Sequence, residues 1–200
     1  MDGIAWAASA MLAARERLEI ASQNLANAST DGFRGLVARG RLTAHGVRIS
    51  QGTLPAQGPL RRTGRAYDLA LVGGGSFCLR DARGTPVHTR DGAFTPDRYG
   101  VLRDDAGRAL MGARGEVHVL PGASVDSRGR VRLHGRTIDR ILLPARSSVR
   151  SGYLEAANVD AVTQMIDVLG AQRAFESAEK AVAAIDGTQR KAADDVAKVG

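Results

Sequence analysis

The residue types that most often carry catalytic or metal chemistry are present in this sequence, but their spacing predicts no active site. The four histidines, His45, His88, His118 and His134, lie far apart and lack the spacing of metal ligands. Cys78 is the only cysteine, so no disulfide can form within the chain, and its strand-like neighbours favour a small hydrophobic role over that of a nucleophile. We therefore expect neither a metal site nor a catalytic cysteine.

Two other patterns that suggest chemistry also lack the partners that the chemistry needs. The glycines at 73–75 are followed neither by Gly-Lys-Ser/Thr nor by a helix, so they predict a tight turn rather than a phosphate loop. Asp104 and Asp105 are adjacent, so their side chains point apart on a strand or a turn. We expect no catalytic, cofactor-binding or metal-binding residues, no small-molecule substrate and no enzymatic function.

The formal net charge of +7 is unevenly distributed along the chain. Residues 1–33 carry a net −2, residues 34–150 a net +12 and residues 151–200 a net −3. The basic residues of the middle are all arginines at strand-like intervals, and aromatic residues are too few to build a stacking platform for bases. A solvated basic β surface is the favoured interpretation, and a basic nucleic-acid-binding module is the alternative from a different functional class.

Both ends of the chain have the apolar periodicity of long helices. Near the N-terminus a heptad pattern predicts a helix from about residue 4 to 27, with large apolar residues at one seam position: Ile4, Met11, Leu18 and Leu25. Alanines fill the other seam position: Ala7, Ala14, Ala21 and Ala28. Near the C-terminus an apolar stripe predicts a second helix, which begins near Asn158 as its N-cap and runs to about Lys198. The residues of this stripe are Val162, Met165, Leu169, Phe175, Val182 and Ile185.

The middle of the chain alternates short apolar runs with glycine turns, which is typical of antiparallel β structure. The runs are 69–72, 77–79, 86–89, 117–120, 131–133 and 138–143. The predicted fold class is therefore α+β, with long N- and C-terminal helices forming a coiled-coil-like pair and an inserted antiparallel all-β domain. The predicted divisions are an N-terminal helix and turn (1–33), an extended linker (34–64), the β domain (65–150) and the C-terminal helix (151–200).

No apolar run approaches the roughly 20 residues that are needed to span a bilayer, so we expect no membrane insertion. The first residues lack the basic and apolar regions of a secretory signal, so we expect no cleaved signal peptide.

Three motifs stand in order along the chain. Residues 22–34 contain Asn-Leu-Ala-Asn, then Thr30, and then Gly-Phe-Arg; residues 89–94 read Thr-Arg-Asp-Gly-Ala-Phe. Residues 152–160 contain Gly-Tyr-Leu-Glu and Asn-Val-Asp, and 173–176 read Arg-Ala-Phe-Glu. Together they resemble the signatures of the bacterial flagellar axial proteins, the rod and hook family. The short stretch between 143 and 151 departs from that pattern and predicts a trimmed β domain.

The resemblance implies a structural subunit of the flagellar basal-body rod, polymerising through its terminal helices as part of the periplasmic drive shaft for motility. It implies export through the flagellar type III apparatus without a cleaved signal, with other rod proteins and further copies of the chain as partners. The proximal rod members of the family are the most similar, and a distal rod or hook-type subunit is the alternative. We also expect the helices to become ordered only on assembly, because ordering them costs conformational entropy.

The heptads and the resemblance together predict an assembly interface of eighteen residues. The alternative is that these residues pack within one chain, as in an ordinary hairpin of two helices. They are Ile4, Met11, Leu18, Asn24, Leu25, Asn27, Thr30, Gly32, Phe33, Leu154, Glu155, Asn158, Val159, Met165, Leu169, Arg173, Phe175 and Val182. The large apolar members are expected to form the seam between helices. Gly32 is expected at positive φ, Phe33 to anchor the exit from the first helix, and Arg173 to pair with a carboxylate of a neighbouring helix.

Overall fold

The structure is a computed structural model that describes residues 3–43 and 46–199, except the side chains of residues 4 and 192–199. The chain divides into two compact units. The helical unit comprises Met1–Ala28, Gly35–Leu54 and Val159–Gly200, and the β unit comprises Ser29–Arg34 and Pro55–Asn158. The fold is α+β, as predicted, with one helix near each end of the chain and antiparallel strands between them.

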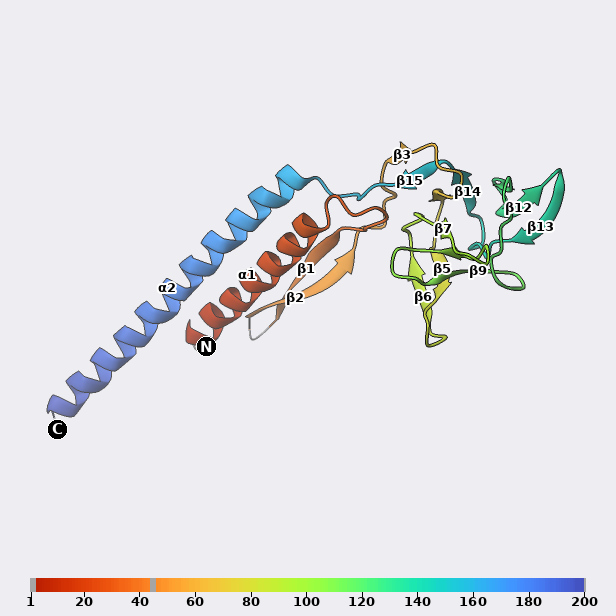
Figure 1. Cartoon of the computed structure of the whole chain (residues 1–200). Helices are drawn as coiled ribbons and strands as arrows, with labels where there is room; N and C mark the ends of the chain where they lie inside the picture. Colours follow the sequence, from red (N-terminus) through yellow and green to blue (C-terminus); the bar gives the residue numbers. More distant parts are fainter. Residues whose placement is uncertain (1–2, 44–45, 200) are drawn as a thin grey trace. The chain divides into compact units, whose positions relative to one another are not determined.

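In the helical unit, α1 (Gly3–Ala26) and α2 (Ala161–Val199) lie side by side and antiparallel (Figure 1). Near one end of the pair, a Cβ atom at Gly3 would lie 3.7 Å from Ile185 Cδ1. Near the other end, Asn24 Nδ2 donates a hydrogen bond of 2.9 Å to Gln164 Oε1. Because α2 is 39 residues long and α1 is 24, the C-terminal part of α2 extends beyond α1.

The heptad face of α1 is the face that becomes covered. Ala14 and Ala21 are buried, and Met11, Leu18 and Leu25 are half-buried. Small alanines at every second seam position let another helix approach closely. Ile20, which lies outside the heptad pattern, is also buried; the side chain of Ile4 lies outside the described residues.

Helix α2 carries its apolar residues on two faces rather than on one stripe. One face is buried or half-buried and repeats with alternating spacings of four and three residues: Gln164, Val168, Ala171, Phe175, Ala178, Val182 and Ile185. At about 100° per residue, a second set lies on the opposite side and is exposed: Val162, Met165, Ile166 and Leu169. The stripe expected from the sequence therefore combines residues of both faces.

Residues 36–43 and 46–53, predicted to be part of an extended linker, form the two strands of a β-hairpin in the helical unit. β1 (Leu36–Thr43) pairs antiparallel with β2 (Gly46–Thr53), and Figure 1 shows α1 between this hairpin and α2. The backbone N–H of Val47 donates 3.3 Å to Ser9 Oγ on α1. Val47 and Ile49 alternate with exposed residues, which is the period of a half-covered strand.

The N-cap of α2 also lies two residues beyond the expected position. Asp160, not Asn158, is the N-cap, because its Oδ2 accepts the N–H of Thr163 at 2.8 Å and the hydroxyl of Thr163 at 2.7 Å. Asn158 instead donates from Nδ2 to the carbonyl oxygen of Ala56 at 2.7 Å, within the β unit.

The β unit contains several small antiparallel sheets. One has the order β6-β5-β9-β8-β7, with β10 paired to β9; a second has the order β11-β12-β13; two further pairs are β14-β4 and β15-β3. The bounds are β3 Leu60–Arg62, β4 Leu69–Val72, β5 Phe77–Arg80, β6 Pro86–Thr89, β7 Thr95–Pro96, β8 Leu102–Arg103, β9 Ala109–Gly112, β10 Gly115–Glu116, β11 Ser124–Val125, β12 Arg130–Leu133, β13 Arg136–Arg140, β14 Ser148–Ser151 and β15 Tyr153–Glu155.

A continuous apolar core fills the β unit. Leu69, Phe77, Leu79 and Leu110 have no exposed surface, and the rings of Phe77 and Phe94 meet edge to face with centroids 5.5 Å apart. The runs predicted at 69–72, 77–79, 86–89 and 131–133 coincide with β4, β5, β6 and β12. The run 117–120 forms only an isolated bridge between Val101 and His118, although Val117 and Val119 are buried in the core.

Within the described residues, no helix is long and apolar enough to cross a membrane.

Candidate assembly site and its supporting junction

Parts of the three sequence motifs, residues 29–34, 89–93 and 152–158, meet inside the β unit. The N–H of Gly32 donates to the carbonyl oxygen of Glu155 at 2.6 Å, and the N–H of Asn158 donates to that of Phe33 at 3.4 Å. Asp31 accepts two hydrogen bonds from Arg61, at 2.8 and 3.1 Å. The chain segments that connect to α1 and to α2 are thus tied to each other; we call this region, residues 29–34, 89–93 and 152–158, the junction.

An ion pair between Arg90 and Glu155 lies at the centre of the junction. The two side chains are only 4% and 2% exposed, and Glu155 Oε2 accepts Arg90 Nε and Nη2, each at 2.7 Å. The remaining guanidinium hydrogens are used as well: Nη2 donates to Leu71 O at 2.9 Å, and Nη1 donates to Gly73 O at 3.0 Å and Gly75 O at 2.6 Å. Every N–H of Arg90 therefore has an acceptor, which is the condition under which a buried charge pair is tolerated.

Two glycines, Gly32 in the junction and Gly58 in contact with it, cannot carry a side chain. Gly32 has φ of +72°, as predicted, and a Cβ there would lie 2.2 Å from the backbone nitrogen of Asp91. At Gly58, whose N–H donates 3.1 Å to Glu155 Oε1, a Cβ would lie 1.9 Å from the carbonyl oxygen of Ala156. The backbones of distant segments are therefore in direct contact here, and side chains do not separate them.

Asp91, next to Arg90, is the titratable group of the junction whose environment disfavours charge. Burial raises the pKa of its carboxyl above the ordinary value of 3.8, although the hydrogen bond from the N–H of Ala93 acts in the opposite direction. The carboxylates of Asp31, Asp105 and Asp104 also raise this pKa.

In the helical unit, Asn24 joins three elements. Its Oδ1 accepts the N–H of Leu36 at 2.7 Å and its Nδ2 donates to the carbonyl oxygen of Leu36 at 2.9 Å, so it pairs with β1 as a strand residue would. Nδ2 also donates to Gln164 on α2. Asn24 is almost fully buried, and a buried amide with specific partners fixes how elements align.

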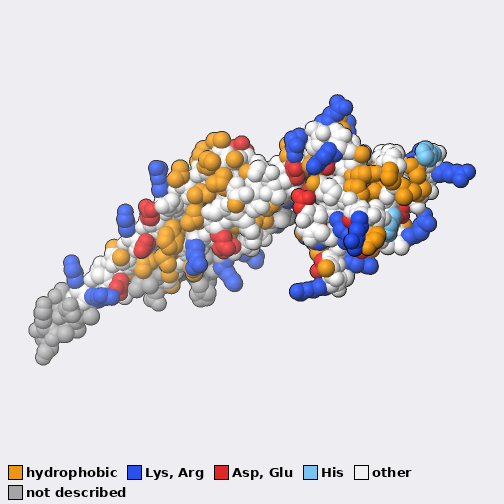
Figure 2. All heavy atoms as spheres, viewed as in Figure 1, with side chains coloured by type: hydrophobic (Ala, Val, Ile, Leu, Met, Phe, Trp, Pro, Cys, Tyr) orange, Lys and Arg blue, Asp and Glu red, His pale blue; other side chains and the backbone are white. Residues whose placement is uncertain are grey.

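Four exposed large apolar side chains lie close together on α2 near its start. Val162, Met165, Ile166 and Leu169 follow one another at spacings of three, one and three residues, and each is more than half exposed. Figure 2 shows hydrophobic side chains gathered on the surface of the helical unit. We call these four residues the α2 stripe.

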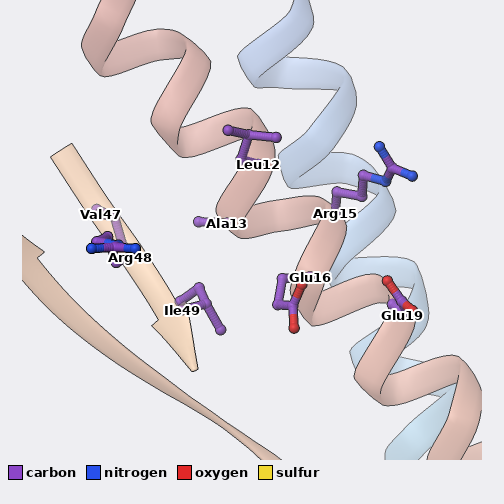
Figure 3. Close-up of a pocket in the computed structure, with 8 residues that line it drawn as sticks. All are labelled: Leu12, Ala13, Arg15, Glu16, Glu19, Val47, Arg48 and Ile49. Carbon is purple, nitrogen blue, oxygen red and sulfur yellow. The ribbon is translucent and has the colours of Figure 1, made fainter. Parts of the chain in front are cut away.

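A groove of about 420 Å³ lies between α1 and β2 (Figure 3). Its apolar lining consists of Leu12 and Ala13 from α1 and Val47 and Ile49 from β2. Glu16 points from α1 toward β2, whereas Arg15 points to the other side of α1. We call this the α1–β2 groove.

The structure separates seventeen of the eighteen residues of the interface hypothesis into four groups; the side chain of the remaining residue, Ile4, lies outside the described residues. Leu154 and Glu155 are buried in the β unit, and Gly32, Phe33 and Asn158 make backbone contacts within the junction. Asn24 is buried between the helices, while Met11, Leu18, Leu25, Phe175 and Val182 are half-buried on the facing sides of α1 and α2. Asn27 and Val159 are half-buried at helix ends. Thr30, Met165, Leu169 and Arg173 are exposed.

Sequence reasoning did not assign a role to Arg90, to Gly58 or to the hairpin residues Val47 and Ile49. The Thr-Arg-Asp-Gly motif contained Arg90, but nothing in the sequence indicated its partner 65 residues away. The alternation of Val47 and Ile49 with polar residues was the available signal for the hairpin.

Comparison with protein families gives two matches. The family described as "Flagella basal body rod protein" matches residues 4–34, and the family described as "Flagellar basal body rod FlgEFG protein C-terminal" matches residues 150–195. These ranges contain α1, most of α2 and two of the three junction segments.

Individual relatives extend the similarity over nearly the whole chain. The flagellar basal-body rod protein FlgF of Caulobacter vibrioides is 27% identical over 231 aligned residues, covering 92% of this chain and 94% of the relative. FlgF of Escherichia coli is 27% identical, covering 86% of this chain and 89% of the relative. The flagellar hook protein FlgE of Rhizobium meliloti is 33% identical but covers 59% of this chain and 32% of the relative. The alignment with the first is longer than the 200 residues of this chain, so that relative carries residues that this chain lacks.

Proposed function

Because the chain belongs to the flagellar rod and hook family, we propose that it is a structural subunit of the bacterial flagellar basal-body rod and that it polymerises through its two helices. The observation that carries the second part is the α2 stripe, whose four side chains are 53–64% exposed. Apolar surface gains about 25 cal/mol for each Å² that is removed from water, so a neighbouring subunit that covers the stripe is stabilised.

The antiparallel contact of α1 and α2 and the alternating spacing of four and three residues support a coiled-coil-like pairing of these helices. The β unit buries its own apolar residues and is the more variable outer part in this proposal. The longer alignment with the Caulobacter relative agrees with a trimmed β domain.

The proposed location is the periplasmic rod of the basal body, and the proposed partners are other flagellar rod proteins, further copies of this chain and the flagellar type III export apparatus. The similarity to several FlgF proteins over most of both chains supports a place in the rod. We propose the proximal rod; a distal rod or hook-type subunit is the alternative. No chemistry is required of such a subunit, so the proposal includes no enzymatic activity and no cofactor.

The test starts from a motile bacterium in which this gene is deleted, and the deletion strain is then complemented. A chain with Met165→Gln and Leu169→Gln replaces two stripe residues by polar residues of similar length, and Leu142→Gln is the matched control because Leu142, in the β unit, is also 51% exposed. The wild-type chain and the control restore swimming and are found in purified basal bodies. The stripe variant is exported but is absent from basal bodies, and its cells do not swim.

Normal swimming of the deletion strain contradicts the proposed function as a whole. Full incorporation of the stripe variant contradicts only polymerisation through α2.

A further inference from the structure

The helical unit exposes two apolar surfaces, the α2 stripe and the α1–β2 groove, and they have complementary forms. The stripe is a convex ridge of four branched or long side chains on one side of a helix. The groove is hollow, with Leu12 and Ala13 on one wall and Val47 and Ile49 on the other (Figure 3). A ridge of this kind buries its side chains when it enters a groove of this kind.

Within one chain the two surfaces cannot meet. The stripe lies on the side of α2 opposite to the residues that face α1, such as Ala171 and Phe175. The groove lies on the side of α1 that faces the hairpin, and α1 separates the hairpin from α2 (Figure 1). Contact between stripe and groove therefore requires a second molecule.

Charged groups beside the two surfaces are also complementary. Glu16 and Glu19 line the groove, and Arg173 is exposed on α2 one turn beyond Leu169. None of these three side chains forms an ion pair with any residue that the structure describes. Arg15 and Arg48 also line the groove, but Arg15 points away from β2.

The spacing of apolar and charged groups is the same on both helices. Glu16 follows Leu12 by four residues, and Arg173 follows Leu169 by four residues. Four residues advance about 6 Å along an α-helix, so when α2 of one molecule lies parallel to α1 of another with the two leucines in contact, the carboxylate and the guanidinium lie at the same level.

We propose that the α1–β2 groove binds the α2 stripe of a second copy of this chain, with Leu169 in the apolar part of the groove and Arg173 paired with Glu16. This inference rests on the proposed function and names the contact that polymerisation uses. The two surfaces differ, so the contact is heterologous: in a bound pair, one molecule still has a free stripe and the other still has a free groove. Such contacts produce open helical filaments when the rotation between copies does not close a ring.

Cysteine crosslinking in purified basal bodies tests the contact. The full chain carries Cys78→Ser with Leu12→Cys and Leu169→Cys, and mild oxidation is followed by non-reducing electrophoresis. Disulfides form only when Cα atoms are within about 7 Å, so the proposed contact gives a ladder of covalent dimers and higher multimers. The control pair is Leu42→Cys with Leu169→Cys, because Leu42 is an exposed residue of β1 outside the groove; this pair gives no ladder.

Charge exchange provides a second, independent readout. Glu16→Arg alone and Arg173→Glu alone each place like charges together and lower the amount of chain in basal bodies by about tenfold or more. The double variant restores incorporation to at least half of the wild-type amount. Arg17→Glu, which reverses an exposed charge of α1 outside the groove, leaves incorporation within twofold of wild type.

If the cysteine variant is present in basal bodies but gives no crosslinked multimers, the proposed contact is wrong and the proposed function still stands. The same conclusion follows if the double charge variant is incorporated no better than the two single variants. Absence of the wild-type chain from basal bodies overturns both.

Discussion

The β unit and the helical unit treat their apolar side chains differently. In the β unit Leu69, Phe77 and Leu110 are fully enclosed by other residues of the same unit. Among the described side chains of the helical unit, the buried apolar residues are Ile20 and small alanines, and the larger side chains of α2 near its start are exposed. The first unit has the core of an independent domain, whereas the second leaves a stripe of apolar side chains uncovered. If the chain polymerises as proposed, its local stability and its assembly reside in separate units.

Hydrogen exchange of the free full-length chain measures this contrast directly and is expected to give the largest effect. Amides of β5 and β9 exchange only on global unfolding, which costs about 5 kcal/mol or more in a typical domain, so they are slowed by a thousandfold or more. Amides of residues 3–26 and 161–191 are expected to exchange close to the unfolded rate, because the contact between α1 and α2 fully buries few large apolar side chains and the α2 stripe stays exposed. Strong protection of both helices at micromolar concentration contradicts the contrast.

The second prediction concerns the ion pair that holds the junction. Arg90→Met leaves Glu155 charged and buried without its partner, and it also removes the donors to Leu71 and Gly73. We expect the β unit to lose about 3–5 kcal/mol of unfolding free energy. Urea titration followed by near-ultraviolet circular dichroism of tyrosine measures this, because all three tyrosines, Tyr67, Tyr99 and Tyr153, belong to the β unit.

The matched control is Arg61→Met, which breaks the more exposed pair with Asp31 and costs less than about 1 kcal/mol. Equal losses in the two variants are incompatible with a special role for the buried pair.

The third prediction separates backbone conformation from close contact at the junction. Gly32 and Gly64 have nearly the same φ, +72° and +77°, but only at Gly32 does an added Cβ meet other atoms. Gly64→Ala is expected to cost about 1–2 kcal/mol for the left-handed conformation alone. Gly32→Ala adds overlap with the backbone of Asp91 and is expected to cost about 2–4 kcal/mol. The same tyrosine signal reports both; a Gly32 variant as stable as the Gly64 variant shows that the segment can move away.

These predictions also show which parts of the molecule could be predicted from the sequence. Gly32 at positive φ, the helix near each end and four of the short strands follow from local patterns of glycine and apolar residues, and the structure confirms them. The pairing of Arg90 with Glu155 could not be predicted, because it is a contact over 65 residues that depends on how the sheets fold back.

The faces of α2 on which its apolar residues lie also could not be predicted from the sequence, because they depend on a contact with a distant segment. Met165 and Phe175 fit one approximate stripe, and only the position of α1 decides that Phe175 faces it while Met165 does not. The sequence did not predict the hairpin of strands 36–43 and 46–53, because these strands are polar and exposed on one side and their composition is that of a linker.

The smallest predicted effect concerns Asp160, the N-cap of α2. Hydrogen bonds from the hydroxyl and then the N–H of Thr163 lower the pKa of Asp160 below its ordinary value of 3.8. A lowered pKa in the folded helix means that the ionised cap stabilises α2 fully above the ordinary pKa and that this stabilisation is lost as the pH falls through the lowered value. Asn is as good an N-cap as Asp but does not titrate. The helical signal at 222 nm of the wild-type chain is therefore expected to decrease below about pH 4 by more than that of Asp160→Asn, and identical pH profiles contradict the role of Asp160 as a charged cap.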